Sequence, residues 1–130
     1  MSKHTVAIIK PDAVKNRNVG EIIQTIEKNK FDIVFIREIK MSVKAASEFY
    51  KEHKDKDFYK DLVKFMSSGV VFVLILEKKN AIVEWRRVML DIRKKFTGKK
   101  LYENAVHGSD SEDSFIREVE FLYKNTRSSK

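Results

Sequence analysis

The sequence lacks cysteine, so it has no disulfide framework, no thiolate metal site and no cysteine nucleophile. It has one proline and four glycines among 130 residues, and 42% of its residues are hydrophobic, which excludes collagen-like, low-complexity and fully disordered chains. The longest apolar run, Val70 to Leu76, is too short to span a bilayer, and no charged-then-apolar leader opens the chain. These absences predict a soluble domain in a reducing compartment, with the cytoplasm as the expected location and no membrane partner.

Several motifs of nucleotide and hydrolase chemistry are also missing. The chain has no Walker-type glycine-rich loop, no dinucleotide fingerprint, no nucleophile elbow and no His/acid spacing for a metal. An enzyme of this sequence that acts on phosphates must therefore hold them with side chains, and any metal ion must arrive with the substrate. What the chain has in excess is positive charge, with 27 Lys and Arg against 19 Asp and Glu and a formal charge of +8. This excess predicts an anionic partner: nucleic acid, an anionic surface or a phosphorylated small molecule.

The length and the absence of repeats or composition breaks predict one domain over residues 1–130, with a flexible tail at about 124–130. Hydrophobic periodicity predicts strands over 5–9, 31–41, 70–76 and 104–107, the third of them central. It predicts helices over 20–29, from 43, over 58–67, from 81, and after 109–111, with a polar loop over 96–103. This order indicates an α+β fold: a ferredoxin-like α/β sandwich, a four-stranded antiparallel sheet covered by helices.

Two local patterns refine this prediction. Ser42 and Asn80 stand where each can cap the helix that follows it. In the second strand, alternation places a set of apolar residues on one side: Phe31, Ile33, Phe35, Ile39 and Met41.

His107 differs from the two other histidines, His4 and His53, which are expected to be solvated. It ends a predicted strand and precedes Gly108, whose missing side chain lets a ligand approach the backbone. The helix start that follows offers free N–H groups to an anion, and an imidazole with an unperturbed pKa of about 6.5 is a competent nucleophile. On this spacing alone, a loop histidine bonded to the helix cap is the more common arrangement.

Glu118 lies at the edge of the apolar face of the last predicted helix. A carboxylate there needs a hydrogen-bonded or charged partner. A histidine needs such a partner to fix its tautomer and leave its other ring nitrogen free to attack. The pair suggests nucleophilic catalysis by His107, although a boundary glutamate that reaches into water fits the spacing as well.

Positive charge is concentrated between Arg86 and Lys100, where seven cations and one acid give a net charge of +6. Clustered cations bind phosphate oxygens and neutralise charge that develops during phosphoryl transfer. A solvated helix face or a non-specific nucleic-acid patch has the same composition. Lys10 adds a cation at the end of the first strand.

An aromatic–apolar cluster around the junction of the two middle helices suits a core or a base-stacking surface: Tyr50, Phe58, Tyr59 and Leu62.

The segment Asn104-Ala-Val-His107-Gly108-Ser109-Asp110 resembles the active-site signature of nucleoside diphosphate kinases, N-x-x-H-[GA]-S-D. The similarity extends from about Thr5 to Tyr123 and implies a ferredoxin-like fold. It also implies ping-pong transfer of the γ-phosphate of a nucleoside triphosphate, typically ATP, to a nucleoside diphosphate. Other family landmarks are matched by Ile9-Lys10-Pro11-Asp12-Ala13, Val19-Gly20-Glu21-Ile22-Ile23, Phe65-Met66-Ser67-Ser68-Gly69 and Arg87-Val88-Met89-Leu90.

This resemblance implies a role for each matching residue. His107 is implied as the nucleophile that becomes phosphohistidine, Glu118 as the residue that orients its ring, and Ser109 as part of the same hydrogen-bond network. Mg²⁺ is implied as the cofactor, carried by the nucleotide and not by protein side chains. The implied nucleotide-binding residues are Lys10 and Asn104 at the sugar hydroxyls (Lys10 also near phosphate), Arg87 and Tyr50 at the phosphates, and Phe58 and Leu62 at the base.

The chain departs from the family pattern just before the signature, where the family has a long loop. Here only Asp91 separates the Arg87-Val88-Met89-Leu90 match from Ile92-Arg93-Lys94-Lys95-Phe96, so the segment is about ten residues short. Arg93 is the expected second phosphate arginine, with Lys94 as the alternative, and the family's phosphate-binding threonine has no counterpart. The extra lysines are expected to replace part of the lost contacts: Lys94, Lys95 and Lys99.

Family members assemble as dimers that build tetramers or hexamers, so the resemblance implies a homo-oligomer of this kind. The competing hypothesis is a catalytically silent relative that binds nucleic acid or protein through the basic segment, with affinity that falls steeply with salt. The presence of His107, Glu118, Lys10 and Asn104 together favours the enzyme.

Overall fold

The computed structural model describes residues 2–100 and 102–126. Its centre is a four-stranded sheet in the order β2-β3-β1-β4, with every neighbouring pair antiparallel. The strands are β1 (His4–Ile9), β2 (Asp32–Ile39), β3 (Val71–Glu77) and β4 (Val106–Gly108). The predicted α+β ferredoxin-like sandwich is confirmed, with β3 inside the sheet as expected.

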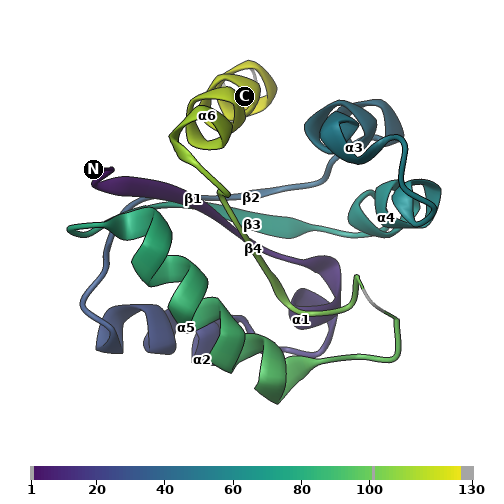
Figure 1. Ribbon diagram of the computed structural model, residues 1–130. Helices are drawn as coiled ribbons and strands as arrows, with labels where there is room; N and C mark the ends of the chain where they lie inside the picture. The colour runs from purple at the N-terminus through teal and green to yellow at the C-terminus, as the bar shows by residue number, and fades with distance from the viewer. Residues whose placement is uncertain (1, 101, 127–130) are drawn as a thin grey trace.

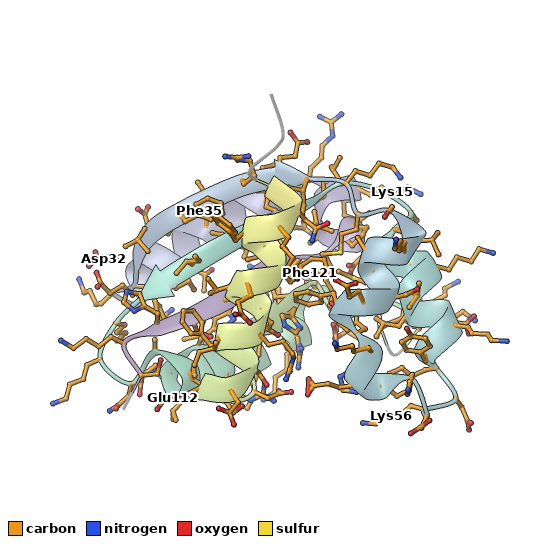
Figure 2. All side chains as sticks on the ribbon, turned by 90° about the horizontal axis from the view of Figure 1, so that it is seen from above. Lys15, Asp32, Phe35, Lys56, Glu112 and Phe121 are labelled. Carbon is orange, nitrogen blue, oxygen red and sulfur yellow. The ribbon has the colours of Figure 1, made fainter. Side chains whose placement is uncertain are left out.

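Helices cover both faces of this sheet (Figure 1). One face carries α1 (Pro11–Lys15), α2 (Val19–Lys28) and α5 (Ala81–Phe96). The other carries α3 (Val43–Phe49), α4 (Tyr59–Met66) and α6 (Glu112–Thr126), with the short 3-10 helix η1 (Lys51–His53) after α3. Seen from above, α6 lies beside the α3–α4 hairpin, and Phe121 lies on the side of α6 that faces the hairpin (Figure 2). None of the helices in the described part of the chain is both long and apolar enough to cross a membrane.

The apolar residues form one cluster on each face of the sheet. Trp85, Met89 and Ile22 belong to the cluster beneath α2 and α5, whereas Tyr50 and Phe121 belong to the cluster beneath α3, α4 and α6. Strand β3 contributes to both clusters because its side chains are apolar on both faces, the pattern of a central strand.

The helix starts differ from the sequence prediction in two places. Ser42 caps α3 as predicted, and its Oγ accepts a hydrogen bond of 3.0 Å from the Ala45 N–H. Asn80 precedes α5 in a left-handed conformation (φ 57°), and its side chain makes no capping hydrogen bond there. Helix α1 was not predicted; it begins at Pro11, whose fixed φ suits the first helical position.

Strand β2 contains an irregularity that overturns its predicted one-sided pattern. Ile33 pairs with Leu76 and Phe35 pairs with Ile75, so Val34 is an extra residue in the ladder. A bulge shifts the alternation by one residue, and every later side chain changes face. Ile33 therefore packs with the cluster beneath α2 and α5, whereas Phe35 and Ile39 pack with the opposite cluster.

The bounds of the last strand and the end of the last helix also differ from the prediction. Strand β4 covers 106–108 where the pattern predicted 104–107, and Ala105 before it has a left-handed φ of 73°. Helix α6 continues to Thr126, so residues 124–126 of the predicted flexible tail are helical, and 127–130 lie outside the described residues.

Candidate active site

A cleft of about 240 Å³ opens at the end of the sheet where β1 meets β4. Its walls come from segments far apart in the sequence. The strands β1 and β4 are neighbours there, and helices from both faces of the sheet reach this end. Seven of the ten residues predicted for the site line it, and two more, Ser109 and Glu118, lie directly behind its histidine. The lining residues are Lys10, Tyr50, His53, Phe58, Leu62, Arg86, Arg93, Tyr102, Asn104, His107, Gly108 and Asp110.

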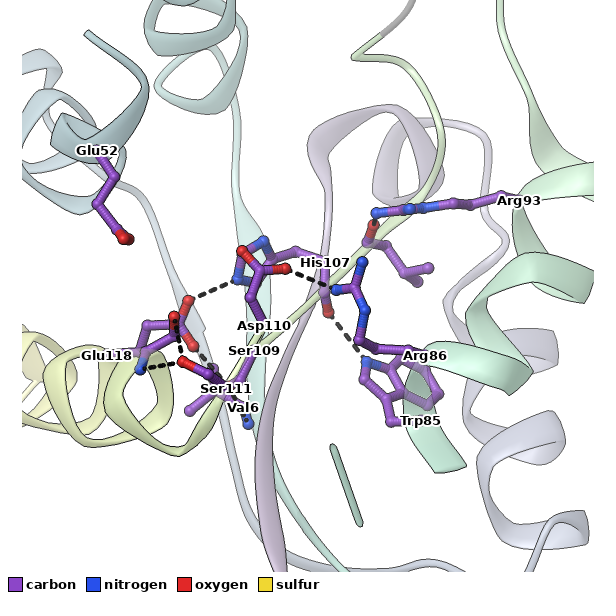
Figure 3. Close-up of polar contacts among 12 residues, drawn as sticks. Val6, Glu52, Trp85, Arg86, Arg93, His107, Ser109, Asp110, Ser111 and Glu118 are labelled. Carbon is purple, nitrogen blue, oxygen red and sulfur yellow. Dashed lines mark hydrogen bonds and ion pairs between the residues drawn. The ribbon is translucent and has the colours of Figure 1, made fainter. Parts of the chain in front are cut away.

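His107 is held from behind by a buried network (Figure 3). Its Nε2 lies 2.9 Å from Oε2 of Glu118, and the Ser109 hydroxyl donates to Oε1 of the same carboxylate at 2.6 Å. The Val6 N–H donates in turn to Ser109 Oγ at 3.0 Å. Glu118 is 7% exposed and Ser109 is fully buried. Because an ionised carboxylate only accepts, this arrangement places the proton of the neutral ring on Nε2 and leaves the lone pair on Nδ1.

Two aromatic rings fix the plane of the His107 imidazole. Phe49 meets it edge-on with ring centroids 5.4 Å apart, and Tyr50 does so at 5.9 Å. The Tyr50 hydroxyl is buried and has no hydrogen-bond partner among the described residues. Burial, followed by the charge of Glu118, raises the pKa of Tyr50, so this hydroxyl stays a protonated donor.

Lys10 and Asn104 are brought together at the other end of the cleft. The Lys10 ammonium donates to Asn104 Oδ1 at 2.7 Å and to the Tyr102 carbonyl at 3.3 Å. Lys10 is only 6% exposed. Desolvation, strengthened by the positive charge of Arg93, lowers the pKa of Lys10 to about 8.

Arg86 and Arg93 reach the cleft from one face of α5, since residues seven apart lie two turns along a helix. Arg93 donates to the Val106 carbonyl at 3.0 Å, and Arg86 donates to Asp110 at 2.8 Å (Figure 3). Burial, and next the charge of Arg86, lower the pKa of Arg93. The structure thus brings Arg93, and not the alternative Lys94, to the wall of the cleft.

Arg87 is placed differently from its prediction. It does not line the cleft; its guanidinium donates to Glu84 at 2.8 Å on the outside of α5, where the side chain is 57% exposed. The cause is the phase of the helix, in which buried residues such as Trp85 and Met89 set the direction of every other side chain. Arg86, the residue before it, lines the cleft instead, and motif matching gave no sign of this.

His53 is another cleft residue that sequence reasoning missed. It was expected to be solvated, but it lines the cleft between Tyr50 and Phe58, with ring centroids at 6.4 Å and 6.2 Å. Its Nδ1 is buried without a partner among the described residues. The available signal was its position three residues after Tyr50, which a single helical turn brings to the same side.

The extra lysines separate into two groups. Lys95 forms an ion pair with Glu21 of α2, and Lys94 is exposed on α5. Lys99 instead lines a basic depression that shares Arg93 and Asn104 with the cleft; its other lining residues are Thr97, Gly98 and Lys100.

The donor set of the cleft suits an anion and not a bare cation. Asp110 is its one acidic residue, and that carboxylate is already paired with Arg86. The described residues contain no group of three or more His, Asp and Glu side chains that could hold a metal ion. Lys10, Arg86 and Arg93 present positive charge to whatever enters.

This combination of an oriented imidazole with a free lone pair and several cations is the equipment of a phosphoryl-transfer enzyme. The family model for nucleoside diphosphate kinase matches residues 3–128. The chain belongs to the nucleoside diphosphate kinase family, as the signature around His107 predicted.

Individual relatives agree with this assignment. The chain is 43% identical to a nucleoside diphosphate kinase of Campylobacter lari, over 94% of this chain and 96% of that protein. It is also 43% identical to nucleoside diphosphate kinase 1 of Protochlamydia amoebophila, over 95% and 94%.

Solved structures of the family share the fold. The nucleoside diphosphate kinase of Aquifex aeolicus superposes with a TM-score of 0.85 at 31% identity, covering 92% of this chain and 94% of that one. The enzyme of Halobacterium salinarum, solved in complex with CDP, gives 0.84 at 30% identity, with 94% and 88% covered. The chain is therefore a nucleotide-binding kinase, a nucleoside diphosphate kinase by class.

Proposed function

We propose that the chain transfers the γ-phosphate of a nucleoside triphosphate, typically ATP, to a nucleoside diphosphate through a phosphohistidine on His107. The observation that carries this proposal is the pairing of His107 Nε2 with Glu118 at 2.9 Å, which leaves Nδ1 as the nucleophilic nitrogen beside a cationic cleft. Ser109 supports it by holding the second carboxylate oxygen.

Both half-reactions take place at the same nitrogen, Nδ1 of His107. In the first, the Nδ1 lone pair forms a bond to the γ-phosphorus, and the bond from that phosphorus to the bridging oxygen breaks, so the nucleoside diphosphate leaves with the electron pair. In the second, a terminal oxygen of the acceptor diphosphate attacks the phosphorus and the P–N bond breaks. Glu118 keeps its hydrogen bond to Nε2–H throughout and stabilises the positive charge that the ring carries while phosphorylated.

The side chains around the nucleophile divide the nucleotide between them. Arg86, Arg93 and Lys10 offset the charge of the phosphate chain, and the Tyr50 hydroxyl donates to a phosphate oxygen. Arg86 takes the part first expected of Arg87. Asn104, with Lys10, holds the sugar hydroxyls.

Phe58 and Leu62 hold the base, Phe58 by stacking, and stacking accepts any base. Both line the cleft on the side of α4, with His53 beside Phe58. The complex of the Halobacterium salinarum relative with CDP supports a site that accepts a nucleoside diphosphate.

Mg²⁺ enters as part of the substrate, on the phosphate oxygens. This assignment is supported by the donor set of the cleft, which has several cations and a single, already paired carboxylate. The ion would neutralise phosphate charge as the bond to the leaving group breaks. A dimer-based homo-oligomer and a cytoplasmic location, both expected from the sequence, stay predictions, as does nucleic-acid binding.

Incubation with γ-labelled ATP and Mg²⁺ tests the proposal directly. We expect an acid-labile, alkali-stable label on the protein that a nucleoside diphosphate discharges. Replacement His107→Ala should abolish the label, whereas His4→Ala, at a half-buried histidine outside the cleft, should leave it unchanged. A wild-type protein that acquires no label under these conditions would refute the phosphohistidine route.

A further inference from the structure

Trp85 is the chain's one tryptophan, and it lies directly beneath the strand that carries His107 (Figure 3). It is fully buried on α5, in the cluster that also contains Met89. Its indole Nε1 donates a hydrogen bond of 3.1 Å to the backbone carbonyl of His107. None of the nucleotide contacts proposed above involves Trp85.

Gly108 shows how closely this strand rests on the indole. A Cβ atom added at Gly108 would lie 2.6 Å from Cδ1 and 2.8 Å from Nε1 of Trp85, and 2.9 Å from Cε of Met89. The family signature admits glycine or alanine at this position, but this chain has room for glycine alone. The backbone next to the nucleophile is therefore in direct contact with Trp85.

Strand β4 is short and lies at an edge of the sheet, so contacts from α5 add to the few that its strand pairing provides. It has three residues and, among the described strands, pairs with β1 alone. The residue before it, Ala105, is in the left-handed region that side chains disfavour. A second side chain of α5, Arg93, donates to the Val106 carbonyl, so one helix supports two consecutive carbonyls of this strand.

The orientation of the indole is itself fixed. Phe31 meets it edge-on at 5.9 Å with an interplanar angle of 85°, and both rings are buried. Helix α5 extends without a break from Ala81 to Phe96, through the region where the family pattern has its long loop. The helix thus provides a rigid platform under the active-site strand.

We propose that Trp85 is a positioning residue for phosphoryl transfer: its N–H fixes the His107 carbonyl, and through it the direction from which Nδ1 attacks. The inference rests on the proposed phosphohistidine. A nucleophile that is displaced by a fraction of an ångström loses the in-line geometry on which the rate depends, whereas nucleotide binding by the arginines is unaffected.

The test compares Trp85→Phe, which keeps an aromatic ring but removes the N–H, with Ile26→Val, which removes a methyl group from the same cluster and no hydrogen bond. We expect Trp85→Phe to lower the rate constant of phosphohistidine formation at saturating ATP about three- to tenfold, the effect of one hydrogen bond. Its dissociation constant for ADP should stay within about twofold of wild type. Ile26→Val should leave both quantities unchanged.

Fluorescence of the wild-type protein provides a second readout that needs no Trp85 variant. Because Trp85 is the one tryptophan and bonds the residue that is phosphorylated, its emission should change with the same rate constant as label incorporation, and a nucleoside diphosphate should reverse the change. In His107→Gln the emission change with ATP should be lost.

The outcomes separate this inference from the proposed function. A labelled wild type with an unchanged rate in Trp85→Phe, or with an equal loss in Ile26→Val, overturns the positioning role alone. If Trp85→Phe does not fold, a labelled wild type whose tryptophan emission does not change also overturns the positioning role alone. A wild type without label overturns the phosphohistidine and the positioning role with it.

Discussion

Adjacent arginines on α5 illustrate how one residue's place in a helix decides its chemistry. Arg86 lies at the cleft with Asp110, whereas Arg87 is turned about 100° further around the helix and pairs with Glu84. Glu84 and Arg87 stabilise each other's charged forms: the hydrogen bond between them lowers the pKa of Glu84 and raises that of Arg87. Neither side chain of this pair lines the cleft.

We predict that Arg86→Ala weakens ADP binding about tenfold or more, because a charge-assisted bond to phosphate is lost. Arg87→Ala is the matched control: it removes the same charge one residue away and should change the dissociation constant less than about twofold. Calorimetric titration of both variants with ADP measures the difference. Equal losses in the two variants would mean that net charge matters and position does not.

The fold changes the protonation of Lys10 in a way that titration can measure. Burial disfavours its charged form, so its pKa falls to about 8. A bound phosphate favours the charged form and raises the pKa again. We therefore expect the unbound protein to carry a partly neutral Lys10 at pH 8, and we predict that nucleotide binding restores the proton.

The expected result is uptake of about half a proton on ADP binding at pH 8, falling to almost none at pH 6, where Lys10 is already charged. Affinity should decline as the pH rises through 8, because the neutral amine attracts phosphate less. Titrations in two buffers with different ionisation enthalpies measure the uptake. Lys10→Gln should remove the pH 8 uptake, and an identical uptake in this variant would assign the proton to another group.

At the scale of elements, α5 and the turn after it stand where the family pattern has a long loop. The helix carries two cleft arginines and Trp85, and the turn is closed by Glu103, whose carboxylate accepts from the Lys100 N–H. Of the lysines expected to compensate for the missing loop, Lys95 is paired with Glu21, whereas Lys99 borders the cleft together with Lys100.

We therefore predict that Lys99→Ala with Lys100→Ala raises the dissociation constant for ADP about two- to fivefold at low ionic strength, as expected for exposed charges near a phosphate. The double variant Lys94→Ala with Lys95→Ala removes as much charge from the same segment and should have little effect. The difference should shrink at high salt. Equal affinities for both double variants would show that the turn takes no part in binding.

At the scale of the whole molecule, the net charge of +8 is less concentrated than the sequence suggests. Two cations of the segment 86–100 form ion pairs with acids on other parts of the fold, Lys95 with Glu21 and Arg86 with Asp110, and Arg87 pairs with Glu84 on the same helix. Of the other cations of this segment, Arg93 lines the cleft and Lys99 and Lys100 line the depression beside it, whereas Lys94 is exposed elsewhere on α5. The cations of this segment that border the cleft fit a phosphorylated small substrate.

Most of the element order and of the apolar faces could be predicted because they follow from local periodicity, which tertiary contacts reinforce here. The bulge at Val34 could not, since one extra residue in a strand has no sequence signature and only pairing with β3 reveals it. Helix α1 was missed because Pro11 was interpreted as the end of a strand and not as the first residue of a helix.

The sequence by itself determined the family, the fold class and most of the candidate site. The reason is that the signature around His107 and the residues Glu118, Lys10 and Asn104 can each be matched to the family pattern without knowledge of the structure. Only the tertiary structure decided which arginine of the pair Arg86 and Arg87 faces the cleft, that His53 lines it, and that Trp85 supports His107. The physical reason is that these assignments depend on the direction of side chains. That direction is set by helix phase against a core assembled from distant segments.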